Sequence, residues 1–194
     1  MKLVSAQNIT YSINENILFH NLSFGVNSGE GLHIKGGNGS GKSTLIRIIL
    51  GITTPTKGLI KRYSEDLKIS YLGHKNAIKN YLTPIENLEL LFNDVEIKIA
   101  YEWLYKFNLS HVQDELAASL SFGQQKKLAL IRVLAQSPEL IVLDEPFVGL
   151  DQTAADQLNN FLEKQLSEGV GLIFTSHINP KISCKVLDLE AKNV

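Results

Sequence analysis

The stretch from Gly36 to Ser43, GGNGSGKS, constrains the fold of this chain more than any other. It follows the segment GEGLHIK, in which Leu32 and Ile34 alternate with polar neighbours, and it precedes the apolar run LIRIIL. The alternation predicts a short strand, and the apolar run predicts a helix. Glycine permits positive φ and lets a ligand approach the main-chain N–H groups closely. The sequence therefore predicts a strand, a phosphate-binding loop and a helix, in that order.

The residue types in this loop fit a nucleoside triphosphate that is bound together with Mg²⁺. The N-terminus of the following helix directs its partial positive charge at phosphate groups. Lys42 would reach the β- and γ-phosphates, and the Ser43 hydroxyl would bind Mg²⁺. A glycine-rich turn without function is the alternative, but the Lys-Ser pair at a helix start argues against it. The candidate nucleotide-binding residues are Gly36, Gly37, Asn38, Gly39, Ser40, Gly41, Lys42, Ser43 and Thr44.

A second stretch, ELIVLDEPFVGLD, places two acidic residues at the end of an apolar run. The continuous run LIVL is typical of a central parallel strand that is covered on both faces. Asp144 at the end of this strand is a candidate Mg²⁺ ligand, and Glu145 can activate the attacking water. An acidic turn at a strand end is the simpler alternative, and the phosphate loop upstream favours the catalytic interpretation.

Two further segments predict groups that face phosphate. SLSFGQQKKLALIRVLAQ reads as an amphipathic helix with Ser121 as its N-cap, and the bare backbone of Gly123 fits a second anion site. An ordinary capped surface helix is the alternative. LIFTSH delivers His177 at the end of a short strand. A lone histidine is more often structural, but ligand groups gather at the strand ends of such a sheet.

The composition limits the function classes. Lys and Arg number 19 against 20 Asp and Glu, so the net charge of −1 shows no footprint for nucleic acid. No apolar run approaches the roughly 18–20 residues that span a bilayer. One cysteine excludes an intramolecular disulfide framework. We therefore expect a soluble chain that contacts a membrane only through a partner and does not bind nucleic acid.

Together these motifs resemble those of ABC ATPases. GGNGSGKST resembles the Walker A motif, LSFGQ the signature, LIVLDEP Walker B, GLD the D-loop and TSH the switch histidine. The resemblance implies an α/β P-loop ATPase core with an antiparallel β-subdomain and an inserted α-helical subdomain. We expect one ATP-binding domain over residues 1–194, with the helical subdomain at about residues 76–125.

The resemblance also implies the ligands and the assembly. ATP and Mg²⁺ are the expected cofactors, and the family works as a head-to-tail homodimer in which each ATP lies between one Walker A and the other signature. The implied catalytic residues are Lys42, Glu145 and His177, and the implied metal-site residues are Ser43, Asp144 and His74. The signature residues implied to contact nucleotide are Ser121, Gly123 and Gln124. Two positions depart from the common pattern: Phe122 replaces the first glycine of LSGGQ, and the D-loop reads VGLD where SALD is common.

An aromatic residue near the N-terminus is expected to stack on adenine. Tyr11 is the candidate, although Phe19 is nearby and either ring is equally typical of a β-subdomain core.

The segment ISYLGHKNAIKNYLTPIENLELLF indicates the subfamily. His74 stands where most ABC ATPases carry glutamine, and the segment resembles the CcmA family, the ATP-binding subunits of a haem exporter in cytochrome c biogenesis. TPIE predicts a helix start with Thr83 as N-cap, Pro84 next and Glu86 closing a capping box. The resemblance implies a CcmB-like integral membrane permease as partner and a peripheral location at the cytoplasmic face of the inner membrane.

Other classes fit less well. A lipid or drug exporter subunit is the nearest alternative. Soluble ABC ATPases of DNA repair carry long coiled coils between Walker A and the signature, and the segment from Lys42 to Ser121 has no sustained heptads. Translation-type ABC proteins carry two cassettes. A binding module without catalysis would not need Lys42, Asp144, Glu145 and His177 together.

Overall fold

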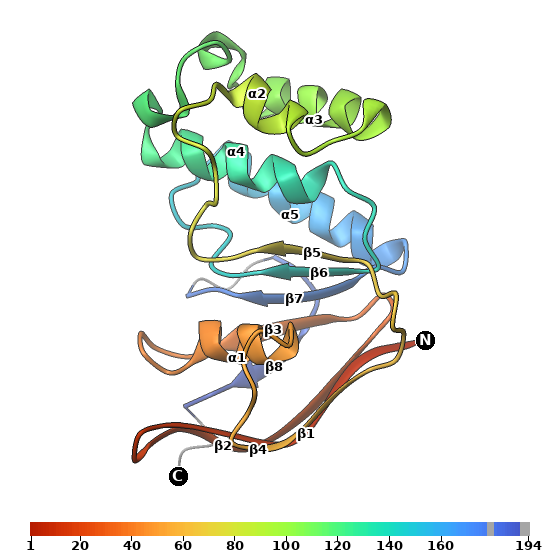
Figure 1. Cartoon of the computed structure of the whole chain (residues 1–194). Helices are drawn as coiled ribbons and strands as arrows, with labels where there is room; N and C mark the ends of the chain where they lie inside the picture. The colour runs from red at the N-terminus through yellow and green to blue at the C-terminus, as the bar shows by residue number, and fades with distance from the viewer. Residues whose placement is uncertain (178–180, 191–194) are drawn as a thin grey trace.

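A computed structural model describes residues 1–177 and 181–190 of the chain, so the end of the predicted domain 1–194 lies outside the described residues. Two sheets and several helices form successive layers (Figure 1). The strands are β1 (Lys2–Ile13), β2 (Asn16–Asn27), β3 (Gly31–Lys35), β4 (Lys57–Arg62), β5 (Ile69–Leu72), β6 (Leu140–Leu143), β7 (Gly171–Thr175) and β8 (Lys185–Asp188). The α-helices are α1 (Lys42–Ile49), α2 (Pro84–Glu89), α3 (Asp94–Lys106), α4 (Phe122–Leu134) and α5 (Gln152–Ser167), and short 3₁₀ helices cover Ser110–Val112 and Ala117–Ser119.

The larger sheet is parallel and positions the site. Its strand order is β5-β6-β7-β3-β8. The strand before the phosphate loop and the strand before Asp144 are both present as predicted. Because the strands run in the same direction, the residues that follow β3, β6 and β7 emerge at one edge of the sheet. The phosphate loop, Glu145 and His177 are therefore brought to the same edge.

Strand β3 is buried on both faces. His33 is buried together with its neighbours Leu32 and Ile34. Its ring stacks on Phe174 with ring centroids 4.8 Å apart, and its Nε2 lies 3.0 Å from the Ser176 carbonyl oxygen. The reason is that β3 lies inside a parallel sheet covered on both faces, so neither side of the strand reaches water.

The smaller sheet is antiparallel, with strand order β2-β1-β4, as expected for the β-subdomain of an ABC ATPase. Helix α1 lies between this sheet and the parallel one (Figure 1). Leu45, Ile46 and Ile49 of α1 are fully buried in the core that the two sheets share. This packing fixes the start of α1, and with it the phosphate loop.

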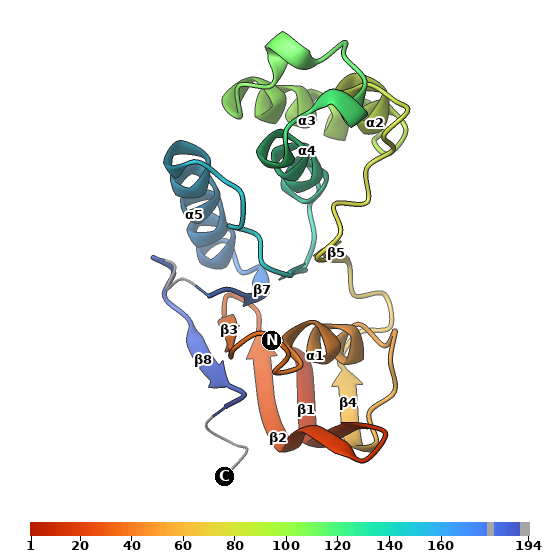
Figure 2. The same ribbon diagram turned by 90° about the vertical axis from the view of Figure 1, so that its left-hand side faces the viewer.

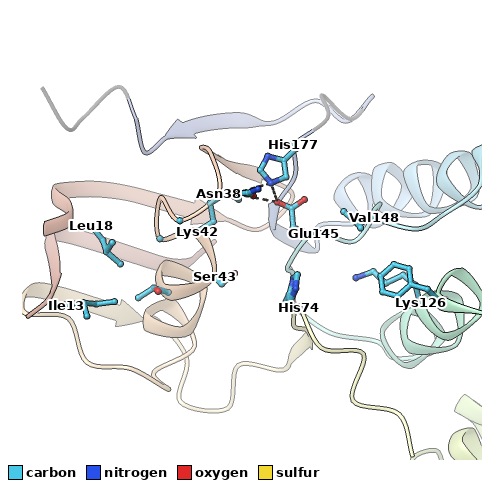
Figure 3. Close-up of a pocket in the computed structure, with 14 residues that line it drawn as sticks. Ile13, Leu18, Asn38, Lys42, Ser43, His74, Lys126, Glu145, Val148 and His177 are labelled. Carbon is cyan, nitrogen blue, oxygen red and sulfur yellow. Dashed lines mark hydrogen bonds and ion pairs between the residues drawn. The ribbon is translucent and has the colours of Figure 1, made fainter. Parts of the chain in front are cut away.

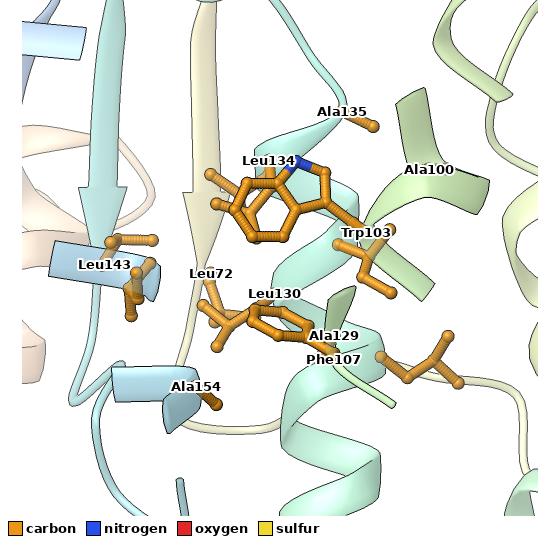
Figure 4. Close-up of a cluster of buried hydrophobic side chains, with 14 of the residues drawn as sticks. Leu72, Ala100, Trp103, Phe107, Ala129, Leu130, Leu134, Ala135, Leu143 and Ala154 are labelled. Atoms are coloured by element: carbon orange, nitrogen blue, oxygen red, sulfur yellow. The ribbon is translucent and has the colours of Figure 1, made fainter. Parts of the chain in front are cut away.

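The opposite face of the parallel sheet is covered by α4 and α5, and α3 packs on α4 (Figure 2). Trp103 of α3 and Phe107, which caps the end of α3, meet Leu130 and Leu134 of α4 in the core of this region (Figure 4). The segment before α4 corresponds to the predicted helical subdomain, residues 76–125, whose boundaries stay a prediction. Among the helices of the described residues, none is long and apolar enough to cross a membrane.

The two predicted helix caps are confirmed. The Thr83 side chain accepts a hydrogen bond from the Glu86 N–H, and the Glu86 side chain closes the capping box at the start of α2. Ser121 caps α4 in the same way, with Gln124 as the reciprocal partner. Both helices therefore begin at the residue that the sequence indicates.

Candidate active site

A cavity of about 590 Å³ lies at the edge of the parallel sheet, beside the phosphate loop (Figure 3). It is lined by Ile13, Leu18, Asn38, Gly39, Gly41, Lys42, Ser43, Thr44, His74, Phe122, Lys126, Glu145, Val148 and His177. Residues from the phosphate loop, the segment after β5, the loop after β6 and the segment after β7 therefore meet in one space. All three predicted catalytic residues are among them.

The phosphate loop has the backbone that the glycines predict. Gly39 and Gly41 have φ of 82° and 93°, in the left-handed region that side chains disfavour. A Cβ atom on Gly41 would lie 3.0 Å from ring carbons of the buried Phe19. Gly41 is the N-cap of α1, which begins at Lys42, so the close contact with Phe19 lies at the point where the loop enters the helix.

Glu190 contacts the phosphate loop from a distant part of the chain. The N–H of Gly37 donates to the Glu190 carboxylate over 2.5 Å. No sequence motif indicates this contact, because Glu190 follows β8 and its pairing with Gly37 depends on the register of the parallel sheet.

Lys42 is the centre of the site. Its side chain is buried, and Nζ donates to the carbonyl oxygens of Gly36 at 2.9 Å and Gly37 at 3.0 Å. The same ammonium lies 3.7 Å from Oε1 of Glu145 and 3.5 Å from Nε2 of His177. The structure thus groups the three predicted catalytic side chains within contact of one another (Figure 3).

Glu145 is held in an uncommon backbone conformation. Its φ is 50°, which few non-glycine residues adopt. The Glu145 N–H donates to Oγ1 of Thr175 over 2.8 Å, and the Thr175 hydroxyl donates to Oδ1 of Asp144 over 2.7 Å. Strained backbone of this kind persists where surrounding contacts enforce it. Thr175, the last residue of β7, therefore fixes both acidic residues.

The carboxylate of Glu145 has an oxygen available for chemistry. Its Oε1 is buried and lies 3.2 Å from Nε2 of His177 and 3.7 Å from Nζ of Lys42. A carboxylate oxygen beside the phosphate loop can accept a proton from water, as a general base does.

The predicted Mg²⁺ residues lie at the same edge. Ser43 and His74 line the cavity, and Asp144 is buried just behind Glu145. A hydroxyl and a carboxylate are oxygen donors of the kind that Mg²⁺ prefers, and this ion commonly takes only one or two protein ligands beside phosphate oxygens. The residues present therefore fit the ion. Within the described residues no cluster of three or more His, Cys, Asp or Glu forms a separate metal centre.

Tyr11 is not brought to the cavity. Its ring stacks on Phe19, with centroids 6.1 Å apart, inside the antiparallel sheet. The cavity wall at this end is instead formed by the aliphatic side chains of Ile13 and Leu18 (Figure 3). Ile13 ends β1 and Leu18 lies in β2, so both flank the hairpin that turns beside the phosphate loop. Both positions carry aliphatic residues, so the expectation of an adenine-stacking aromatic ring does not point to them.

The signature residues Ser121, Gly123 and Gln124 do not line this cavity in the single chain. Phe122 and Lys126 of the same helix do. Burial lowers the pKa of the Lys126 ammonium, while the nearby carboxylates of Asp144 and Glu145 act in the opposite direction. No sequence motif indicates Lys126, which lies on α4 and lines the cavity together with Glu145.

Comparison with known proteins agrees with this geometry. The ABC transporter family matches residues 19–148. The CcmA cytochrome c biogenesis ATP-binding export protein of Nitrosomonas europaea is 35% identical, covering 91% of this chain and 89% of the relative. The CcmA protein of Hahella chejuensis is 34% identical and covers 95% and 93%.

Solved structures give the same result. A bacterial ABC transporter cassette solved as a dimer has a TM-score of 0.80 at 26% identity, covering 96% of this chain and 95% of that one. A putative metal-chelate type ABC transporter in an inward-facing conformation has a TM-score of 0.79 at 29% identity, covering 97% and 80%. The chain therefore belongs to the ABC transporter family, as an ATP-hydrolysing subunit related to the CcmA proteins.

Proposed function

We propose that this chain energises a separate integral membrane permease in cytochrome c biogenesis, in the export or handling of haem. The similarity to CcmA proteins over nine-tenths of the chain supports the process. The observation that carries the ATPase role is the buried Glu145 carboxylate, which lies between Lys42 and His177 beside the phosphate loop. The substrate is ATP.

The phosphate loop binds the triphosphate in this proposal. The residues from Gly36 to Thr44 present backbone N–H groups, and the N-terminus of α1 adds its partial positive charge. Lys42 exchanges its contacts with the Gly36 and Gly37 carbonyl oxygens for phosphate oxygens. Ser43 and Asp144 would hold Mg²⁺, which would neutralise part of the phosphate charge.

Glu145 then acts on the attacking water. Its Oε1 accepts the proton as the water oxygen approaches the γ-phosphate. His177, 3.2 Å from this oxygen, orients the carboxylate and can contact the γ-phosphate. The Thr175 hydroxyl is hydrogen-bonded both to the Glu145 N–H and to the Asp144 carboxylate, so it positions the base and the metal ligand together.

A second copy of the chain completes the site. Ser121, Gly123 and Gln124 start a helix whose N-terminus can bind phosphate, yet they lie outside the cavity of their own chain. A head-to-tail homodimer would place them over the partner's nucleotide. The related bacterial cassette that forms a dimer supports this arrangement.

The permease is proposed to bind near α2. Large apolar side chains are exposed there, in the segments just before and just after the helix: Tyr81, Leu90, Leu91 and Val95. Clustered exposed apolar side chains commonly mark interaction sites. A CcmB-like permease bound at this surface would hold the chain at the cytoplasmic face of the inner membrane.

Affinity purification from the native membrane should recover this permease. We expect the tagged wild-type chain to copurify with an integral membrane subunit that mass spectrometry identifies as part of cytochrome c biogenesis. Leu90→Glu should reduce the recovered permease at least tenfold, about 1.4 kcal/mol of binding free energy, because it places a charge in an apolar contact.

Leu59→Glu is the matched control, since Leu59 on β4 is 60% exposed and Leu90 is 63% exposed. This control should retain the permease. Recovery of a lipid or drug permease instead would contradict the role in cytochrome c biogenesis and leave the ATPase role intact.

His74 is proposed to link the nucleotide to the permease, because it lines the cavity and precedes the α2 region along the chain. His74→Gln should keep ATPase activity within roughly tenfold of wild type, about 1.4 kcal/mol, since glutamine supplies both a donor and an acceptor. His74→Ala should lower turnover further, most of all the permease-stimulated rate. Phosphate release with and without the membrane subunit measures both.

His20 provides the control for this pair, because it is an exposed histidine on β2 and does not line the active-site cavity. His20→Ala should behave as wild type in both assays. If His74→Ala also matched wild type in both, His74 would have no part in coupling.

A further inference from the structure

The N-terminus of α4 touches the loop that carries Glu145. The ring of Phe122 lies directly over Gly149: a Cβ atom on Gly149 would be 2.5 Å and 2.7 Å from two of its ring carbons. The backbones also meet, because a Cβ atom on Gly123 would lie 2.7 Å from the Gly149 carbonyl oxygen. The Gly149 carbonyl oxygen leaves no room for a side chain at Gly123. At Gly149 the obstacle is the Phe122 ring, which is 61% exposed and would have to turn away to admit a side chain.

Gly149 is suited to this contact in its backbone as well. Its φ is 83°, in the left-handed region. Glycine adopts this conformation without steric cost. An alanine at position 149 would therefore meet two obstacles, the backbone conformation and the Phe122 ring.

An ion pair fastens the same two segments one helical turn further along. Nζ of Lys127 lies 2.5 Å from Oδ2 of Asp151, and Oδ1 of Asp151 caps α5 by accepting the Ala154 N–H over 2.8 Å. The Lys127 ammonium and this capping bond hold the pKa of the Asp151 carboxyl below its usual value. The loop from Glu145 to Asp151 is thus attached to α4 at two points.

The middle of this loop is anchored in the core. Phe147 is buried, and it lies two residues from Glu145 and two from Gly149. Phe122, Val148 and Glu145 all line the active-site cavity, and Val148 lies across the cavity from Ser43 (Figure 3). The Phe122 ring, Val148 and Glu145 therefore form adjoining parts of one cavity wall, and Phe147 fixes the loop behind it.

We propose that Phe122 and Gly149 are a matched pair that sets the position of the signature relative to the general base Glu145 within one chain. A ring replaces the first signature glycine of the family pattern, and a glycine replaces the alanine of its D-loop, so the two departures compensate each other. The inference rests on the proposed function, in which the signature serves the partner's nucleotide and Glu145 serves the nucleotide of its own chain. The pair then ties two active sites together.

A double-mutant cycle tests the pair with wild type, Phe122→Ala, Gly149→Ala and the double variant. Gly149→Ala should lower kcat for ATP at least tenfold, because the new methyl group displaces the Phe122 ring and with it the cavity wall beside Glu145. In the Phe122→Ala background the same change should lower kcat threefold or less, since only the left-handed backbone conformation at position 149 still opposes alanine. The Kd for ADP should stay within twofold in all four proteins, because the phosphate loop is untouched.

Gly169→Ala is the matched control for backbone strain. Gly169 has φ of 93°, follows α5 and lies outside the cavity, with Ser28 Oγ nearby. This variant should leave kcat unchanged and show no coupling to Phe122→Ala. If Gly149→Ala does not fold, Lys127→Gln and Asp151→Asn give a second double-mutant cycle. Asparagine at position 151 keeps an oxygen acceptor for the N-cap of α5. The double variant should lose less kcat than the two single losses combined.

The outcomes separate cleanly. If Gly149→Ala lowered kcat equally with and without the Phe122 ring, the pairing would be overturned. It would also be overturned if the two changes were coupled in the free energy of unfolding measured in urea but not in kcat. A parallel loss of ADP affinity would show a general structural defect and would also overturn it. A wild-type protein that hydrolyses no ATP would overturn the proposed function instead, and the two failures are thereby distinguished.

Discussion

Lys42→Ala should abolish ATP turnover, with kcat reduced roughly 1000-fold, about 4 kcal/mol of transition-state stabilisation. Lys42 is 7% exposed, and its ammonium contacts the Gly36 and Gly37 carbonyl oxygens and lies 3.7 Å from the Glu145 carboxylate. Its removal takes away the cation that would meet the phosphates and the positive charge beside Glu145. Phosphate release measures the rate, and calorimetry should show weaker binding of ADP.

Lys35→Ala is the control for this change. Lys35 ends β3 next to the phosphate loop, and its side chain is exposed. This variant should bind and hydrolyse ATP as wild type does, which separates the role of Lys42 from a general loss of positive charge near the loop. Near-normal hydrolysis by purified Lys42→Ala protein would contradict the assignment of the phosphate loop.

The part of the site that the sequence predicts best lies within short motifs. The phosphate loop needs a particular backbone, and only glycine supplies it, so Gly39 and Gly41 can be recognised without any knowledge of the fold. Glu145 and His177 are separated along the chain, but each follows a strand of a parallel sheet. The common edge of such a sheet predicts that they meet.

The residues that the sequence did not predict act through long-range geometry. Ile13 and Leu18 reach the cavity only because the hairpin of β1 and β2 turns beside the phosphate loop. The resemblance to ABC ATPases implies an adenine-stacking aromatic near the N-terminus, for which Tyr11 is the candidate, but the Tyr11 ring stacks on Phe19 and does not line the cavity. Thr175 resembles any strand residue until its hydroxyl is seen to join Asp144 and Glu145.

The surroundings of His33 also depend on the order of the strands. Its ring stacks on Phe174 because β3 pairs with β7, and the sequence of β3 alone does not show this pairing. The same limit applies to Phe122. In the sequence it reads as a departure from a glycine-rich motif, and only the structure shows that Gly149 accommodates its ring.

Glu145→Gln should stop hydrolysis while ATP binding continues. The amide has the size of the carboxylate and leaves the backbone contact with Thr175 in place, so the φ of 50° and the position of Asp144 are retained. What it lacks is the basic oxygen, because an amide oxygen is too weak a base to take the proton of water. We expect kcat to fall at least 100-fold, about 2.7 kcal/mol.

The same variant should reveal the proposed dimer. With hydrolysis blocked, ATP stays bound between the phosphate loop of one chain and the signature of the other, so size-exclusion chromatography with ATP should shift the protein from monomer to dimer. ADP should cause no such shift, because it lacks the γ-phosphate that the signature would contact. Glu163→Gln makes the same chemical change at an exposed position of α5 and should neither lose activity nor form the dimer. Normal hydrolysis by Glu145→Gln would show that another group activates the water, whereas ATP binding without a dimer would contradict the head-to-tail assembly and leave Glu145 as the base.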